Sequence, residues 1–535
     1  MTGRLAVDFG TSNTVVTVWD SEAGGARPLN LHEWSRQLTK GLGGNGHERS
    51  WVIPSLIHYS SGGEQWLGQQ VIDKGLNGSP ATFRWLKHYI KQQSAVNVNV
   101  CGRQVNYFKA GEDFLSAILM AIAGEIQLGD EEVAFTVPVE AFEHYENWLA
   151  NVAEKSGIRR FALIDEASAA AIGYGVQSKK EDIFMVFDFG GGTLDISIVL
   201  NEPVSCGSSR HRCRVIGKAG EDLGGSQIDR WLFLEMLSRI GLGAESGEAR
   251  TLGHVLLAQC EQAKESLSFQ ERAEINITDP VSGQTLKADI TRNEFEQLLD
   301  RHEFFTRIHM TLQRALNGAF SRGYQEDQIS SILMVGGCSY IPSVQTLIRQ
   351  RFGTSRVKFD RPFDAVAQGA AAFVSGTELC DYIQHDYAIR YWNPQFSKYE
   401  FRPLVSRGTA YPSEGNVARM LIRATYDGQT QMGIPVFEIG TAASGSHTGD
   451  IELVRDSGGG LRLVKSSPKD DERQVYYWMN EKIPTFLLAE PPAKKGETRF
   501  EVTFNIDGNK RLLVSARDLA TNAFVKRDFP VIKLA

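Results

Sequence analysis

The sequence predicts an α/β fold for residues 1–381, followed by an all-β domain for residues 389–535. An apolar strand ending in Asp-Phe-Gly, then a short turn and a second apolar run, occurs twice: "LAVDFGTSNTVV" from Leu5 and "FMVFDFGGGTLDISIV" from Phe184. Strand-like and helix-like segments alternate up to about residue 381, as in α/β proteins. From about Tyr382 helical periodicity gives way to strand alternation, so we expect the boundary near residues 381–388.

The first region contains a predicted strand–helix–strand unit. "VAFTVPV" and "RRFALIDEA" read as strands, and "HYENWLANVAEKSG" between them reads as a helix closed by Gly157. "ASAAAIGYG" and "DAVAQGAAAFVSG" predict helices of small residues, and the first is suited to close packing against a neighbour. "HVLLAQCEQAKESLS" predicts a helix with one apolar face, and "ISSILMVGGCSYIPSVQTLIRQRFG" predicts a strand, a Gly-Gly turn and a helix.

The second region reads as strands throughout. "FEVTFNIDGNKRLLVSARD" predicts a hairpin that turns at Asp507-Gly508-Asn509, and "MLIRATYDGQTQMGIPVFEI" has a Tyr-Asp-Gly turn between apolar runs. A polar insert covers residues 444–474, and we expect its charges to form a solvated surface hairpin.

Composition limits the class of protein. The chain has 535 residues, with 42% hydrophobic and 23% charged side chains, which is ordinary for a soluble globular protein. A net charge of −7 argues against nucleic acid as a partner, and no apolar run is long enough to span a membrane. The N-terminus enters a strand within a few residues, so we expect no signal peptide. Six scattered cysteines without metal-like spacing favour reduced thiols and a cytoplasmic location.

The repeated glycine turns point to phosphate binding. Such a turn presents consecutive backbone N–H groups, and a nest of this kind binds phosphate oxygens. Asp8 and Asp188 stand just before the two turns, and two carboxylates facing one site would hold Mg²⁺ largely through water. The plainer interpretation is two ordinary hairpins, but the duplicated arrangement makes it the weaker one. A protein kinase is excluded because the chain lacks the Val-Ala-Ile-Lys strand and the His-Arg-Asp loop, and no GxxxxGK[ST] motif is present. "GLGGNG" at residues 41–46 is expected to be a flexible loop.

Two further segments suit a nucleoside. A Gly336-Gly337 turn before a helix lets a flat base or a ribose approach the backbone. Glu261, Lys264 and Ser268 fall on one helical face, where they could reach ribose hydroxyls and base edges. Solvated helix charges are the alternative interpretation of these three residues.

These motifs together resemble the heat shock protein 70 family of chaperones (DnaK-type). The match covers essentially all of residues 4–375, through "VDFGTSN", "FTVPVEAF", "IDEASAAAIGYG", "FDFGGGTLDISIV", "GEDLGGSQID", "CEQAKESLS", "LMVGGCSYIPSVQ" and "DAVAQGAAA". "FRPLVSRGTAYP", "ATYDGQTQMGIPVFEIG" and the hairpin motif above resemble the peptide-binding β-sandwich of that family. The resemblance implies a two-lobed actin-like (ribonuclease H-like) ATPase domain followed by this β-sandwich.

The resemblance also implies residue roles. Lys87 would face the γ-phosphate, Glu166 would order Mg²⁺ and the attacking water, and Pro138 would couple the nucleotide state to the second domain. Thr193 and Asp195 complete the expected catalytic group, and Asp8 and Asp188 are the expected ligands of Mg²⁺ through water. The expected nucleotide-binding residues are Gly10, Thr11, Ser12, Asn13, Gly190, Gly191, Gly192, Gly224, Gly225, Glu261, Lys264, Ser268, Gly336, Gly337 and Asp364.

The chain departs from the family pattern at four places. A surface relay arginine of the family falls on Glu146, and an arginine that often stacks on adenine falls on Glu265. "CDYIQHDYAIRYW" replaces the apolar Leu-rich linker. We expect no helical lid after the last strands, and therefore fast peptide release. Leu404 and Met432 could line an apolar peptide groove, or they could belong to the sandwich core.

The sequence therefore predicts a slow, Mg²⁺-dependent ATPase of chaperone type that binds ATP and ADP. Its expected partners are unfolded or extended peptide clients, with a J-domain co-chaperone and a nucleotide-exchange factor as further candidates. Two alternatives remain at this stage: a non-catalytic nucleotide-binding module that docks one partner, and a small-molecule kinase of the same fold.

Overall fold

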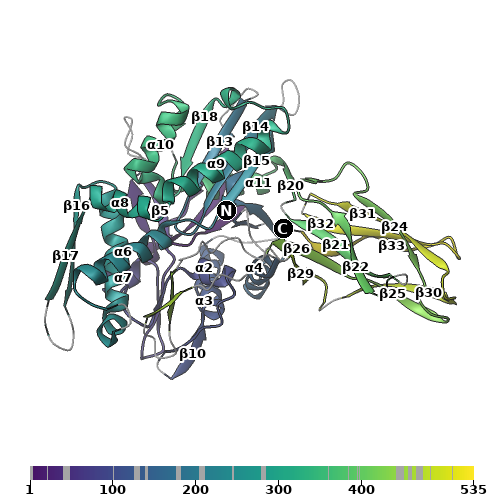
Figure 1. Cartoon of the computed structure of the whole chain (residues 1–535), viewed down its shortest axis with the longest axis horizontal. Helices are drawn as coiled ribbons and strands as arrows, with labels where there is room; N and C mark the ends of the chain where they lie inside the picture. The colour runs from purple at the N-terminus through teal and green to yellow at the C-terminus, as the bar shows by residue number, and fades with distance from the viewer. Residues whose placement is uncertain are drawn as a thin grey trace. The chain divides into compact units, whose positions relative to one another are not determined.

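The computed structural model describes residues 4–534 apart from residues 21, 40–48, 101, 126–132, 139–142, 176–181, 204–210, 244–245, 279–282, 284, 360, 384, 394–395, 397, 442–450, 456–460, 466–473, 482–483 and 509. The chain divides into two compact units (Figure 1). The first unit comprises residues 1–379 and 448–467, and the second comprises residues 380–447 and 468–535. The expected flexible loop at residues 41–46 lies outside the described residues.

The N-terminal half of the first unit, residues 4–175, contains the first sheet. Its strand order is β12-β11-β1-β2-β5-β4, with β3 paired to β2. The strands are β1 (Leu5–Phe9), β2 (Asn13–Asp20), β3 (Gly25–Pro28), β4 (Arg36–Thr39), β5 (Arg49–Pro54), β11 (Val133–Val137) and β12 (Phe161–Asp165). β11 and β12 run parallel with α4 (Glu143–Lys155) between them, so the predicted strand–helix–strand unit is confirmed. Gly157 follows α4 with a φ of 82°, a conformation that glycine adopts without strain.

Smaller elements are inserted between β5 and β11. β6 (Ile57–Tyr59), β7 (Gln65–Leu67) and β8 (Thr82–Phe83) form a three-stranded sheet, and β9 (Asn97–Val100) pairs with β10 (Arg103–Asn106). The helices are α1 (Gln69–Asp73), α2 (Leu86–Lys91) and α3 (Tyr107–Glu125), and α2 packs beside α3. The segment that carries Lys87 therefore rests on a helix of its own half.

The C-terminal half of the first unit, residues 182–379, contains the second sheet. The order β19-β18-β13-β14-β15 places the second Asp-Phe-Gly hairpin at its centre. The strands are β13 (Asp182–Phe189), β14 (Leu194–Pro203), β15 (His211–Glu221), β18 (Ser331–Val335) and β19 (Val357–Lys358). Further elements of this half are α6 (Gly225–Arg239), α7 (Gly247–Leu267), β16 (Arg272–Thr278), β17 (Thr285–Thr291), α8 (Arg292–Arg301), α9 (Phe304–Phe320), the 3₁₀ turns η2 (Glu326–Gln328) and η3 (Gly337–Tyr340), and α10 (Pro342–Phe352).

Two helices of small residues link the sheets. α5 (Glu166–Gly175) lies against β13, β14 and β15, whereas α11 (Ala365–Val374) lies against β1, β2 and β11. The two helices also pack on each other, so closely that a Cβ at Gly369 would lie 1.6 Å from Ala169 O, and one at Gly173 would lie 2.2 Å from Ala365 O. The predicted close packing of small residues is therefore confirmed, because a methyl group cannot be accommodated at either glycine.

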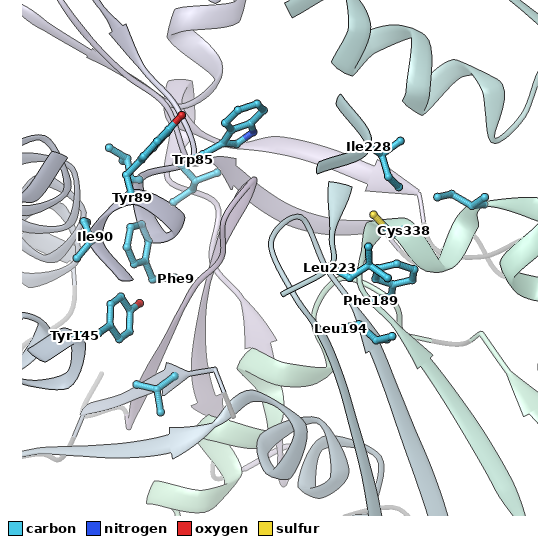
Figure 2. Close-up of a cluster of buried hydrophobic side chains, with 14 of the residues drawn as sticks. Phe9, Trp85, Tyr89, Ile90, Tyr145, Phe189, Leu194, Leu223, Ile228 and Cys338 are labelled. Carbon is cyan, nitrogen blue, oxygen red and sulfur yellow. The ribbon is translucent and has the colours of Figure 1, made fainter. Parts of the chain in front are cut away.

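A large apolar core fills the first unit from both halves. Figure 2 shows labelled side chains of this core in two groups, Phe9, Trp85, Tyr89, Ile90 and Tyr145 on one side of the strands and Phe189, Leu194, Leu223, Ile228 and Cys338 on the other. The apolar runs on either side of each glycine turn are thus buried, which fixes the hairpins and leaves the turns to meet a ligand.

Strands and turns make up the described part of the second unit, as the sequence predicts. One sheet has the order β22-β21-β26-β29, a second has the order β24-β31-β32-β33, and β25 pairs with β30. The strands are β21 (Asp386–Asn393), β22 (Lys398–Val405), β23 (Ala410–Tyr411), β24 (Ala418–Arg423), β25 (Gln429–Ile434), β26 (Val436–Thr441), β29 (Gln474–Trp478), β30 (Thr485–Ala493), β31 (Thr498–Ile506), β32 (Arg511–Asp518) and β33 (Phe524–Lys533). β31 and β32 form the predicted hairpin, and a separate apolar core lies within this unit.

The polar insert contains the expected hairpin, but the sequence does not predict that this hairpin groups with the first unit. β27 (Ile451–Arg455) and β28 (Leu461–Lys465) pair antiparallel, and they group with the first unit although the flanking chain belongs to the second. The unit boundary falls at residues 379–380, just before the expected range, and β20 (Glu378–Tyr382) spans it. Among the described residues, none of the helices is long and apolar enough to span a membrane.

Candidate functional site

The two glycine turns face each other. A Cβ at Gly191 would lie 2.3 Å from Ser12 Oγ, and a Cβ at Gly192 would lie 2.5 Å from Thr11 Oγ1. The second turn is also held from behind, because the first amides of α6 donate to it: Gly225 N–H to Gly190 O at 3.2 Å and Ser226 N–H to Gly191 O at 2.7 Å. The hairpins therefore meet where Gly191 and Gly192 have no side chain, and a Cβ at either position would displace the hydroxyl group of Ser12 or Thr11.

A cavity of about 470 Å³ lies between these turns, within the size range of small-molecule sites. Both Asp-Phe-Gly hairpins contribute to it, together with α2, α7 and the turn that follows β18. The predicted site residues that line it are Asp8, Gly10, Thr11, Ser12, Asn13, Lys87, Glu166, Asp188, Gly190, Gly191, Gly192, Thr193, Gly225, Lys264, Ser268, Gly336 and Gly337. Residues predicted from seven separate segments therefore meet around one space.

The floor of the cavity carries two carboxylates with perturbed acidity. Burial and the nearby Glu166 raise the pKa of Asp8 to about 6, although Lys87 and a 2.6 Å hydrogen bond from Thr136 Oγ1 oppose this shift. Burial, together with Glu166, Asp195 and Asp8, raises the pKa of Asp188 well above its usual value. Carboxylates that repel one another in a buried site are stabilised by a cation.

Lys87 supplies a positive charge beside these carboxylates. The side chain is 4% exposed, and its ammonium donates to Glu166 Oε1. Burial acts to lower the pKa of Lys87, but the neighbouring carboxylates, Glu166 first, outweigh it and hold the pKa above its usual value. The lysine is therefore a permanent cation at the cavity wall.

The wall formed by α7 is organised by ion pairs. Lys264 Nζ lies 2.8 Å from Asp229 Oδ1 of α6, and it also donates to Gly225 O at 3.2 Å. Burial raises the pKa of Asp229 to about 7 although Lys264 opposes this. Glu265 also lines the cavity, and burial together with Glu261 raises its pKa. This wall thus presents both cationic and acidic groups to a ligand.

Gly336 directly follows β18, and its backbone has a conformation that only glycine adopts readily. Its φ is 81°, and a Cβ there would lie 2.3 Å from Phe189 O and 2.8 Å from Asp188 Oδ1. The following residues form η3, so the backbone itself becomes the cavity wall at this point.

Five predicted site residues stand outside the cavity lining. Asp195 pairs across the hairpin with Asp188, and Gly224 packs against Gly192. Glu261 binds Arg84, Asp364 precedes α11 and is fully buried, and Pro138 is buried directly after β11. Of these residues, Asp195 and Gly224 contact lining residues directly.

Glu146, Leu404 and Met432 are also outside the cavity lining. Glu146, expected at the surface, is 3% exposed, so that expectation is wrong: α4 turns this side chain inward. Leu404 and Met432 are 4% and 3% exposed and belong to the core of the second unit. A groove lined by them stays a prediction.

The sequence does not predict an aromatic and cationic part of the cavity. Tyr340 lies in η3 with its ring nearly parallel to that of Phe363, at 5.4 Å between centroids. Arg36 of β4 donates to Asn13 Oδ1 at 3.2 Å. All three side chains line the cavity, and the Tyr that follows the Gly-Gly turn was the one local signal for them.

The donor set fits a magnesium-bound polyphosphate rather than a metal held by protein alone. Among the described residues, no group of three or more His, Cys, Asp or Glu side chains could hold a metal ion. Mg²⁺ keeps several waters and takes one or two carboxylates plus phosphate oxygens, which matches Asp8 and Asp188 beside two glycine cradles.

Comparison with known proteins identifies the family. A family model described as Hsp70 protein matches residues 86–379, more than half of the chain, so the chain belongs to the Hsp70 family of chaperones. It is 26% identical over 552 residues to the chaperone protein DnaK of Emiliania huxleyi, and the alignment covers 97% of this chain and 78% of that protein.

Proposed function

We propose that this chain is a Mg²⁺-dependent ATPase of chaperone type, which hydrolyses ATP slowly to ADP and phosphate and couples the nucleotide state to peptide binding. The observation that carries the proposal is the meeting of both glycine turns, Asp8, Asp188 and Lys87 around one cavity. The two sheets, linked by the packed helices α5 and α11, support a two-lobed actin-like arrangement of the first unit.

Each group of the cavity has a chemical task in this proposal. The backbone amides of the two turns bind phosphate oxygens, and Asp8 and Asp188 hold the water shell of Mg²⁺. Bound Mg²⁺ would neutralise charge on the phosphates. The Lys87 ammonium stabilises negative charge that develops as the γ-phosphoryl group passes to water, and Glu166 keeps the ammonium in place and orients the water. Tyr340 and Phe363 offer flat surfaces for the base.

Lys87→Ala tests the catalytic part. The variant should bind ATP nearly as well as the wild type, while turnover falls about 100-fold or more, because one charge that acts mainly in the transition state is lost. A phosphate-release time course with excess ATP measures this, and Lys74→Ala, an exposed lysine in the same half, serves as the matched control. Unchanged turnover in Lys87→Ala would refute the role of Lys87, and nucleotide binding without turnover in the wild type would identify a binding module instead.

Peptide coupling has its own test. Fluorescence anisotropy with apolar heptapeptides should show binding to the full chain, with a different affinity in ATP and ADP. By linkage the peptide must then change the affinity for nucleotide by the same factor. No binding in either nucleotide state would remove the peptide part and leave the ATPase part standing.

A further inference from the structure

Side chains on the segment that carries Lys87 reach across to the C-terminal half of the first unit. Arg84 Nη1 lies 3.1 Å from Glu261 Oε2 of α7, and Lys91 Nζ lies 2.6 Å from Asp222 Oδ1, just before α6. Between them, Arg230 Nη2 of α6 lies 2.7 Å from His88 Nε2. Three polar contacts between the two halves thus flank Lys87 on both sides along the chain.

Arg230 makes the central contact. It is 7% exposed, and its guanidinium carbon lies 5.5 Å from the centroid of the Trp85 ring. Its two neighbours, Trp85 and His88, stand on either side of Lys87 in the sequence. A single side chain from the C-terminal half therefore touches both ends of the turn that presents the lysine.

That turn has a backbone conformation that needs support. Trp85 is the N-cap of α2 with φ 54° and ψ 36°, a left-handed conformation that is unfavourable for a bulky residue. The indole is 2% exposed and belongs to the same apolar core as Tyr89 and Ile90 (Figure 2). Such a conformation persists only where the surroundings determine it, and Arg230 is part of those surroundings.

The contact between Arg230 and His88 has a defined polarity. The guanidinium can only donate, so the imidazole accepts at Nε2. Arg230, Lys91 and Asp222 all face this imidazole, and burial together with Arg230 lowers the pKa of His88 to about 3. The imidazole is therefore neutral at ordinary pH, and the hydrogen bond is strengthened by the charge on its donor.

We propose that Arg230 is a positioning residue for Lys87: it holds the Trp85–His88 turn against α6, so that the ammonium stands at the polyphosphate only when the two halves are closed. The inference rests on the proposed ATP hydrolysis, in which Lys87 acts on the γ-phosphate. Separation of the halves must break the contacts of Arg230, Lys91 and Arg84, so the same contacts slow the release of nucleotide.

Arg230→Met tests this in the full chain, because methionine keeps much of the apolar stem and removes the guanidinium. We expect kcat to fall about tenfold and release of a fluorescent ADP analogue to accelerate about tenfold, since one charge-assisted contact is lost. Arg230→Lys keeps the positive charge but lacks the planar guanidinium. Its kcat and its rate of ADP-analogue release should therefore lie between those of the wild type and Arg230→Met. Arg239→Met is the matched control on the same helix, because its partners Glu235 and Glu294 lie in a surface network.

Two further measurements keep the inference testable. Amide hydrogen exchange of residues 86–91 without nucleotide should accelerate in Arg230→Met and stay unchanged in Arg239→Met, and this readout needs no ATPase activity. If Arg230→Met fails to fold, Lys91→Met removes the parallel contact to Asp222 and should also accelerate exchange and nucleotide release. Unchanged hydrogen exchange together with unchanged nucleotide release in the variants would overturn the inference. If the wild type did not hydrolyse ATP but exchange and release changed as expected in the variants, only the proposed function would be contradicted.

Discussion

At the scale of single residues, the first unit buries charges that balance one another. Lys87 lies among Glu166, Asp8 and Asp188, and Lys264 pairs with Asp229. The sequence predicted Asp8 and Asp188 from their place before the glycine turns, and the family resemblance implied Lys87 and Glu166, whereas Asp229 was not predicted. It could not predict the partners that Arg230 and Tyr340 find, since those depend on chain segments far apart in the sequence. It also misplaced Glu146, whose burial depends on how α4 packs.

His88 allows a prediction of pH dependence at this scale. Its pKa is about 3 in the folded protein and 6.5 in an unfolded chain, so below pH 6.5 only the unfolded state takes up this proton. The group therefore destabilises the fold as the pH falls from 6.5 towards 3, by up to about 1.4 kcal/mol per pH unit. His88→Gln keeps an acceptor for Arg230 and cannot take up this proton.

Urea unfolding of the wild type and His88→Gln at pH 7.5 and pH 5.5 measures this difference. The wild type should lose more stability on acidification than the variant. The raised pKa values of Asp8 and Asp229 act in the opposite direction, but they are present in both proteins and cancel in the comparison. His309→Gln, which changes an exposed histidine, is the control and should follow the wild type. Equal pH dependence of the wild type and His88→Gln would contradict the assignment.

At the scale of elements, the glycine turns were predictable because their signal is local. Each hairpin is specified by two apolar runs and a few residues between them, and the structure confirms both hairpins. The small-residue helices α5 and α11 were predictable for the same reason. The pairing of β27 with β28 was also expected, but its grouping with the first unit depends on long-range packing that sequence pattern does not encode.

Gly336 and Gly337 allow a prediction about one turn. Gly336→Ala places a methyl group 2.3 Å from Phe189 O in a left-handed conformation, so it should destabilise the fold by about 1–2 kcal/mol or more. At Gly337 a Cβ would meet no atom within 4 Å, so Gly337→Ala should leave stability within about 0.5 kcal/mol of the wild type.

Urea unfolding and nucleotide titration separate the two roles. Gly336→Ala should lose stability, whereas Gly337→Ala should keep stability and weaken only the binding of nucleotide at the cavity wall. If both variants unfolded at the same urea concentration as the wild type, the argument for a required glycine would fail.

At the scale of the whole molecule, the proposal joins an ATPase unit to a unit whose described residues form strands and turns. The change from helical periodicity to strand alternation located the boundary within a few residues of where the structure divides the chain. The central claim concerns the first unit: two glycine turns and two aspartates bind one magnesium–nucleotide complex. The peptide function depends on that claim, because a nucleotide that does not bind cannot shift the second unit between states.

Isothermal titration calorimetry of the full chain with ATP, in the presence and absence of Mg²⁺, tests that claim most directly. We predict one nucleotide per chain, an affinity at least about tenfold higher with Mg²⁺, and loss of most of this difference in Asp8→Asn, but not in the exposed control Asp73→Asn. The absence of binding, or an affinity that Mg²⁺ leaves unchanged in the wild type, would contradict the account.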